Sequence, residues 1–240
     1  MNQTTINQTT GPNRQRVVTS IVALLAVAAV GWYGWREWQL NRTQNIVVDP
    51  NQDPFADIRV SDGLDPLVAA RYESEISGTK KLYEENPGIW ETWIAIGNLK
   101  NLLGDYEGAI AAYQKSLEIT HNNILAYRNI AEVYWRGLAD PEQAVTYYEL
   151  AVNQNFTDIE LYTALGQLYH KQLKDPEKAL NTYRRALSVS PLHPDILSAM
   201  ITLYKDTENT ARYVETVREI RRAYPNEEIY RTAYQDVPLE

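Results

Sequence analysis

The 240-residue sequence contains no cysteine, and this absence removes several kinds of chemistry at once. Disulfide bridges, zinc thiolate sites and a cysteine nucleophile are all excluded, because each of them requires a thiol. The cysteine that carries the lipid of a bacterial lipoprotein is absent as well. Any attachment to a membrane therefore has to come from the polypeptide itself.

Histidine and basic residues are also scarce. The three histidines, His121, His170 and His193, lack the spacing of metal ligands, and no nucleophile elbow or phosphate-binding glycine loop occurs. The first 35 residues hold two of the 23 basic residues and none of the 31 acidic ones, so the remainder is strongly acidic and repels nucleic-acid backbones. We expect a non-enzymatic protein with no catalytic residue, cofactor, metal site or nucleic-acid partner.

Long apolar runs are missing except for residues 17–35, which consist of apolar and small residues and include no charge. At a rise of about 1.5 Å per residue, a helix of this length nearly crosses a hydrocarbon core of about 30 Å. Tryptophan and tyrosine crowd its far end, where aromatic rings favour the headgroup level of a bilayer. We predict that residues 17–35 form a transmembrane helix that anchors the chain by a single pass.

Two alternatives to this anchor remain open. Ala26-Val27-Ala28 resembles the small-residue cleavage site of a signal peptide, and a short apolar helix can also be buried in a soluble protein. The arginines before and after the run are balanced in number, while the free amino terminus favours the cytoplasmic side. We therefore expect the large domain to lie outside the cytoplasm, in a bacterial envelope.

The segments around the apolar run differ sharply in composition. Residues 1–16 are rich in Asn, Gln and Thr, which predicts a disordered tail. Residues 36–65 contain two Asp-Pro pairs and end at the Asp of a third, Asp65-Pro66. Proline keeps its predecessor out of the helical region, so we expect an extended linker there. Residues 66–89 have the irregular apolar spacing of a lead-in helix.

Residues 90–225 repeat with a period close to 35. The recurring columns are Tyr134, Tyr169 and Tyr204; Ala109, Ala144 and Ala179; and Tyr113, Tyr148 and Tyr183. A period of this length predicts a solenoid of stacked helical hairpins, in which each unit completes the core of its neighbour.

The repeated residues resemble those of tetratricopeptide repeat (TPR) proteins, whose unit is a 34-residue helical hairpin. The second repeat matches at Tyr127, Ile130, Ala131, Tyr134, Ala144, Tyr148 and Ala151, and the third at Tyr162, Leu165, Gly166, Tyr169, Ala179, Tyr183, Ala186 and Pro191. The resemblance implies an all-α fold: a right-handed α-solenoid of about four TPR hairpins with flanking helices, preceded by one transmembrane helix. Residues 226–240 then provide a capping helix and tail.

Two local features explain the repeat physically. Gly97, Ala131 and Gly166 stand where two helices approach closely, so a tyrosine ring from the opposing helix is expected to fill the space. The second and third repeats also carry one additional residue directly before the second helix, which we place in Asp140-Pro141-Glu142 and Asp175-Pro176-Glu177. Those sequences are typical helix starts, because Asp caps the first amides and Pro suits the first helical position.

The TPR resemblance implies that the first helices of successive repeats line a concave groove for a peptide or helix of a partner protein. Helical spacing places these side chains toward it: Asn98, Asn101, Arg128, Glu132, Trp135, Thr163, Gln167 and His170. Trp135 is the best candidate for an anchor, although packing between repeats is an equal alternative. TPR proteins that grip a carboxyl-terminal peptide use basic and Asn side chains here, and of this chain's residues only Asn98 fits.

These features lead to a functional hypothesis of a membrane-anchored adaptor or scaffold that recruits or assembles partner proteins through the groove. The alternative is a structural subunit or assembly factor of a large envelope complex, of the secretion, pilus or cytochrome-assembly type, with the groove permanently occupied. The sequence identifies neither the partner nor the oligomeric state.

Overall fold

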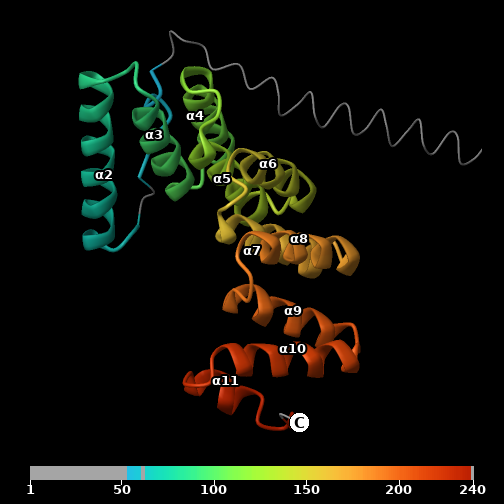
Figure 1. Cartoon of the computed structure of the whole chain (residues 1–240). Coiled ribbons are helices and arrows are strands. Elements are labelled where there is room, and N and C mark those ends of the chain that lie inside the picture. Colours follow the sequence, from blue (N-terminus) through green and yellow to red (C-terminus); the bar gives the residue numbers. More distant parts are fainter. Residues whose placement is uncertain (1–52, 61–62, 239–240) are drawn as a thin grey trace, which may run out of the picture. The chain divides into compact units, whose positions relative to one another are not determined.

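A computed structural model describes residues 53–60 and 63–238, which form α-helices and π-helical turns and contain no strand (Figure 1). The α-helices are α2 (Pro66–Glu85), α3 (Trp90–Leu102), α4 (Tyr106–Ile119), α5 (Ile124–Glu132), α6 (Pro141–Gln154), α7 (Ile159–Gln167), α8 (Pro176–Val189), α9 (Pro194–Asp206), α10 (Thr210–Ala223) and α11 (Glu228–Ala233). The π-helical turns are η1 (Val133–Gly137) and η2 (Leu168–Gln172). The all-α helical solenoid is confirmed.

The tail predicted for residues 1–16 and the transmembrane helix predicted for residues 17–35 lie outside the described residues. Within 53–60 and 63–238, no helix combines the length and the apolar character needed to span a membrane.

The helices pair into four hairpins that follow one another along the chain. The pairs are α3 with α4, α5 and η1 with α6, α7 and η2 with α8, and α9 with α10. Each second helix also contacts the first helix of the next hairpin, as α4 contacts α5, α6 contacts α7 and α8 contacts α9. This succession, visible from green to orange-red in Figure 1, makes every hairpin the packing partner of its neighbours.

A side-chain cap sets the start of every second helix. The side chains of Asp105, Asp140, Asp175 and Asn209 accept hydrogen bonds from the amides of Gly108, Gln143, Lys178 and Arg212, at 2.9, 3.0, 2.9 and 3.2 Å. Each bond satisfies a first-turn amide that has no partner within its helix. The interpretation of the Asp-Pro-Glu sequences as helix starts is therefore confirmed.

The additional residue of the second and third repeats lies inside the first helix of the hairpin, and its expected place directly before the second helix is wrong. The amide of Leu138 donates to the carbonyl of Val133 at 2.9 Å, and that of Leu173 to Leu168 at 3.0 Å, each five residues back. In the first repeat Leu103 instead reaches four residues back, to Leu99. Because the cap holds the second helix in place, the extra residue widens the last turn of the first helix into η1 and η2.

Tyrosine rings fill the space beside the small residues of the first helices, as expected. A Cβ added to Gly97 would lie 2.3 Å from the ring of Tyr113, and one added to Gly166 would lie 2.1 Å from the ring of Tyr183. Both rings are only 1% exposed. The missing side chain therefore allows the two helices of a hairpin to pack closely around a large ring.

The amino-terminal end of the solenoid includes residues that were expected in the extended linker. Residues 54–57 form a turn in which Phe55, 7% exposed, packs with Trp93, Ile96 and Leu99, with the partly buried Tyr83 against this cluster. The prediction of an extended linker is therefore wrong for residues 53–60. Removing the Phe55 ring from water stabilises its packed position, so this segment lies against the solenoid.

The carboxyl-terminal end is closed by α11 and the tail after it. Val237, 4% exposed, packs into the apolar cluster of α9 and α10. The guanidinium of Arg221 donates to the carbonyls of Tyr234 at 3.2 Å and Val237 at 2.5 Å, and that of Arg218 donates to Pro238 at 2.8 Å. These bonds hold the tail against α10, where it covers the last hairpin.

The contact between Gly166 and Tyr183 is tested by Gly166→Ala. The added methyl group must displace a buried ring, so we expect the free energy of unfolding to fall by about 1–3 kcal/mol in urea denaturation. The matched control is Gly78→Ala in α2, where a Cβ meets nothing within 4 Å. This control should be neutral or stabilising by up to about 1 kcal/mol, and equal effects of both substitutions would contradict the packing argument.

Candidate functional site

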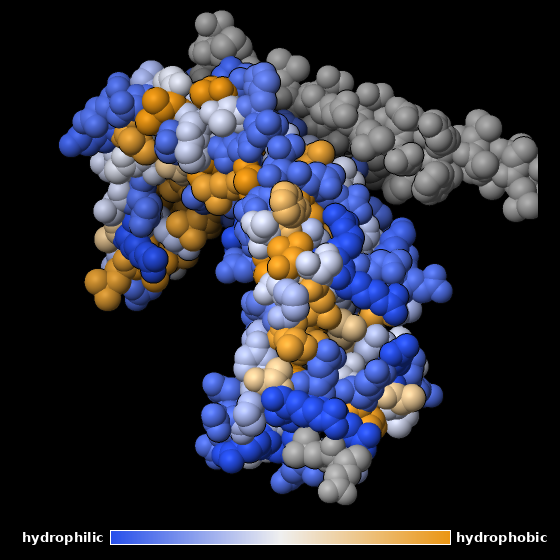
Figure 2. All heavy atoms as spheres, viewed as in Figure 1, coloured by the Kyte–Doolittle hydropathy of each residue, from blue (hydrophilic) through white to orange (hydrophobic). Residues whose placement is uncertain are grey.

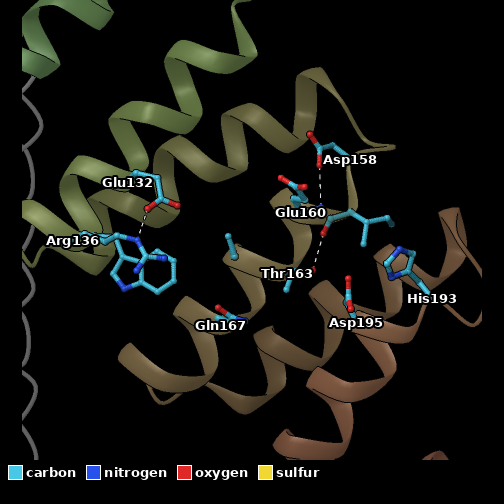
Figure 3. A pocket seen from close by; sticks show the side chains of 11 residues that line it. Glu132, Arg136, Asp158, Glu160, Thr163, Gln167, His193 and Asp195 are labelled. Carbon is cyan, nitrogen blue, oxygen red and sulfur yellow. Dashed lines mark hydrogen bonds and ion pairs between the residues drawn. The ribbon is translucent and has the colours of Figure 1, made fainter. Parts of the chain in front are cut away.

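The first helices of the second, third and fourth hairpins together form a pocket of about 540 Å³. It is lined by Glu132, Trp135, Arg136, Asp158, Ile159, Glu160, Thr163, Ala164, Gln167, His193 and Asp195. Figure 3 shows Glu132 and Arg136 on one side of this space, and His193 and Asp195 on the other. We call it the groove pocket. Three different repeats contribute to it, so it exists only in the stacked solenoid.

Four of the residues predicted for the groove line this pocket: Glu132, Trp135, Thr163 and Gln167. Arg128 is not part of the lining, but its guanidinium forms an ion pair with the lining residue Glu160 at 3.2 Å. Helical spacing therefore identified residues from two of the three helices that build the site.

Asn98, Asn101 and His170 do not line the groove pocket. Asn98 and Asn101 are exposed on α3. The Asn98 side chain accepts hydrogen bonds from the Tyr113 hydroxyl at 2.8 Å and from the side-chain Nδ2 of Asn129 at 3.2 Å. His170 is 8% exposed, and its Nε2 lies 3.1 Å from a carboxylate oxygen of Asp206 on α9. His170 and Asp206 help to line a separate hollow of about 410 Å³.

Trp135 is the one tryptophan in the lining, and its neighbours define the chemistry of one wall. The guanidinium carbon of Arg136 lies 4.3 Å from the centre of the indole ring, and the Nε of Arg136 donates to Glu132 at 2.5 Å. The rings of Tyr148 and Trp135 are inclined at 74°, in an edge-to-face arrangement with 6.5 Å between their centres. Trp135 is half-buried. It therefore packs within its own hairpin and is also exposed to the pocket.

The Tyr148 hydroxyl links this wall to the core of the hairpin, because it donates to the second carboxylate oxygen of Glu132. Burial first, and the Glu132 carboxylate second, raise the pKa of Tyr148 well above its ordinary value. Tyr148 therefore stays protonated as a donor and holds Glu132 beside Arg136. The orientation of the wall depends on this buried tyrosine.

Five lining residues with ionisable side chains were not predicted: Arg136, Asp158, Glu160, His193 and Asp195. Asp158 caps α7 by accepting from the amides of Glu160 at 3.0 Å and Leu161 at 3.4 Å. His193 is the residue before α9. A signal for two of them was present, because Glu160 and Asp195 are 35 residues apart and share one repeat position.

His170 and Asp206 join the third and fourth repeats, and their titration makes stability depend on pH. Burial and nearby Lys171 lower the pKa of His170 below its usual 6.5, although Asp206 acts in the opposite direction. A histidine with a lowered folded-state pKa contributes stability above its unfolded pKa, and this contribution is lost as pH falls through the folded-state value. Lys171 and His170 also lower the pKa of Asp206 below its usual 3.8. The stability that the Asp206 carboxylate contributes is therefore lost as pH falls below about 3.8.

We therefore expect the free energy of unfolding to decrease as pH falls below about 6.5. His170→Gln removes the titrating group and should flatten this dependence between about pH 7 and about pH 5 in urea denaturation. The matched control is His121→Gln, because His121 is exposed. An unchanged pH profile for the His170 variant would contradict the assignment.

Comparison with known proteins identifies the repeats. A TPR repeat model matches residues 97–136, and a tetratricopeptide repeat model matches residues 159–191. The crystal structure of MamA is similar, with a TM-score of 0.53 and 20% identity over 71% of this chain and 97% of that one. A tetratricopeptide repeat protein from Parabacteroides merdae has a TM-score of 0.54 and 22% identity over 71% of this chain and 65% of its own.

No curated protein matches the chain in sequence. Identities at this level establish the fold of the solved relatives for this chain, and nothing of their partners. The two matched segments include α5 and α7, which supply most of the groove pocket. The chain therefore contains tetratricopeptide repeats, arranged in an all-α helical solenoid.

Proposed function

We propose that this protein is a membrane-anchored adaptor that binds a segment of a partner protein in the groove pocket and recruits or assembles that partner at a bacterial envelope. TPR repeats generally serve as non-enzymatic scaffolds for protein binding, and the role proposed here involves no catalysis. The observation that carries the proposal is the groove pocket itself, which presents a half-buried tryptophan among polar side chains from three successive repeats.

The composition of the pocket suits a peptide segment. Interfaces commonly combine an aromatic anchor with a polar rim, and the pocket lining likewise combines the half-buried Trp135 with the polar Glu132, Thr163 and Gln167. Figure 2 shows hydrophilic residues over much of the visible surface, with the hydrophobic residues in separate clusters. A partner with a few apolar contacts and several polar ones fits such a surface better than a continuous apolar helix does.

The apolar run of residues 17–35 supports the anchor in this proposal. Its length suits a bilayer, aromatic residues crowd its carboxyl-terminal end, and the first acidic residue of the chain comes only after it. The soluble domain would then lie outside the cytoplasm and act close to the membrane surface.

The adaptor role is tested by photo-crosslinking in membranes, with Gln167 replaced by a photo-reactive amino acid. Because Gln167 is exposed and lines the groove pocket, we expect a discrete adduct with a partner protein. Trp135→Ala in the same chain should reduce its yield about tenfold, as the loss of an aromatic anchor does. The measurement is the adduct band and its identification by mass spectrometry.

The matched control places the same photo-reactive residue at Asn181, which is exposed on α8 and does not line the groove pocket. Position 181 should give no such adduct. Equal adducts from both positions, or none from 167, would show that the pocket does not receive a partner.

The anchor is tested by extracting membranes with alkaline carbonate. We expect the full chain to remain in the membrane pellet. Leu25→Arg combined with Val27→Arg should release it, because an arginine near the centre of a spanning helix costs about 2.5–3.5 kcal/mol. Leu40→Arg with Ile46→Arg, beyond the apolar run, is the matched control and should stay in the pellet. A wild-type chain in the soluble fraction would contradict the anchor.

A further inference from the structure

We infer that the segment bound in the groove pocket is basic and presents arginine or lysine side chains to it. This inference rests on the proposed adaptor function and adds the chemical class of the partner. It is carried by the charge of the pocket lining, by a guanidinium that the pocket already holds, and by the positions of the carboxylates on its walls.

The lining carries more negative than positive charge. Glu132, Asp158, Glu160 and Asp195 contribute four carboxylates, and Arg136 is the one arginine or lysine among the lining residues. The nearby Arg128 neutralises part of the charge of Glu160 at 3.2 Å. A concave surface with an excess of charge of one sign concentrates ligands of the opposite sign. The pocket therefore attracts a cationic segment and repels an acidic one.

Arg136 shows how the pocket holds a guanidinium. The guanidinium carbon of Arg136 lies 4.3 Å from the centre of the Trp135 ring, while its Nε donates to Glu132 at 2.5 Å. A cation over an indole face that is also paired with a carboxylate is a favourable arrangement for arginine. Arg136 and the Tyr148 hydroxyl already engage both oxygens of Glu132. This wall therefore shows the kind of contact that a guanidinium makes here, while a basic side chain of a partner would have to pair with the other carboxylates.

The remaining carboxylates are placed to receive further basic side chains. Asp158 and Asp195 form no ion pair with another described residue. Figure 3 shows Asp195 across the pocket from Glu132 and Arg136. An extended segment that crosses the pocket from α9 toward α5 would therefore pass carboxylates at both ends. Basic residues along such a segment would pair with Asp158 and Asp195, the two lining carboxylates that form no ion pair among the described residues.

The acidic lining also explains why a carboxylate-bearing partner fits poorly. A terminal carboxylate needs positively charged side chains around it, but Glu132 has a charge of the wrong sign and Thr163 and Gln167 are neutral. Binding a carboxylate here would place like charges close together, which costs affinity. Basic side chains avoid that repulsion.

The test uses the full chain in a neutral detergent and three fluorescent peptides of equal length, built from Arg-Gly-Ser, Gln-Gly-Ser or Glu-Gly-Ser repeats. Fluorescence anisotropy measures the affinity of each at near-physiological salt. We expect the arginine peptide to bind at least about tenfold more tightly than the glutamine peptide, and the glutamate peptide not to bind. Equal affinities for the arginine and glutamine peptides would overturn the inference.

Charge-matched variants separate the pocket from the acidic surface as a whole. Glu160→Gln with Asp195→Asn removes two carboxylates from the pocket, whereas Glu142→Gln with Glu177→Gln removes two exposed ones elsewhere. All four residues lie in the first turn of a helix, so the change in net charge and helix-dipole interaction is the same.

The pocket pair should weaken binding of the arginine peptide about tenfold, and the control pair less than about twofold. Equal losses in both pairs would assign the attraction to the whole acidic surface and overturn the inference.

Competition with the crosslink distinguishes a wrong partner class from a wrong function. The arginine peptide should suppress the adduct formed from position 167, and the glutamate peptide should not. An adduct that persists in excess arginine peptide would overturn the basic-segment inference and leave the adaptor function standing. The absence of any adduct, with no binding of the arginine peptide, would overturn both.

Discussion

The close approach of the two helices in each hairpin is the constraint on which the rest of the structure depends. Gly97 and Gly166 leave room for the rings of Tyr113 and Tyr183, and any Cβ at either glycine would overlap a ring atom. These contacts set the spacing within a hairpin, and the hairpins then stack by burying the remaining apolar faces against one another. A pocket built from three first helices is possible only because that stacking is regular.

The helix caps and the π-helical turns connect this packing to the groove pocket. Asp140 and Asp175 hold the starts of α6 and α8, so the additional residue of these repeats has to be accommodated within the preceding helix. The resulting turn η1 carries Trp135 and Arg136, which form one wall of the pocket. Such π-helical turns frequently occur at functional sites. In η2 the equivalent His170 pairs with Asp206 instead.

Part of the candidate site could be predicted from helical spacing, and the limits of that prediction have a physical cause. Glu132, Trp135, Thr163 and Gln167 face the pocket because residues three and four apart share one face of a helix. Asp158 and His193 stand directly before α7 and α9. Helical spacing does not predict where the side chain of a residue outside the helix points. His170 shares the repeat position of Trp135, yet it pairs with Asp206 at the end of α9, in the following repeat, and lies outside the groove pocket. That contact joins different repeats and has no local signature.

The sequence by itself determined the all-α solenoid, the repeat period and the helix starts, because small residues, rings and capping residues recur at fixed intervals and act over short distances. Tertiary structure alone decided where the additional residue is accommodated, that Phe55 and Val237 close the two ends, and that acidic side chains from three repeats share one pocket. Each of these features depends on contacts between residues that are distant in the chain. The strength of such contacts depends on packing and burial, which a repeat pattern does not encode.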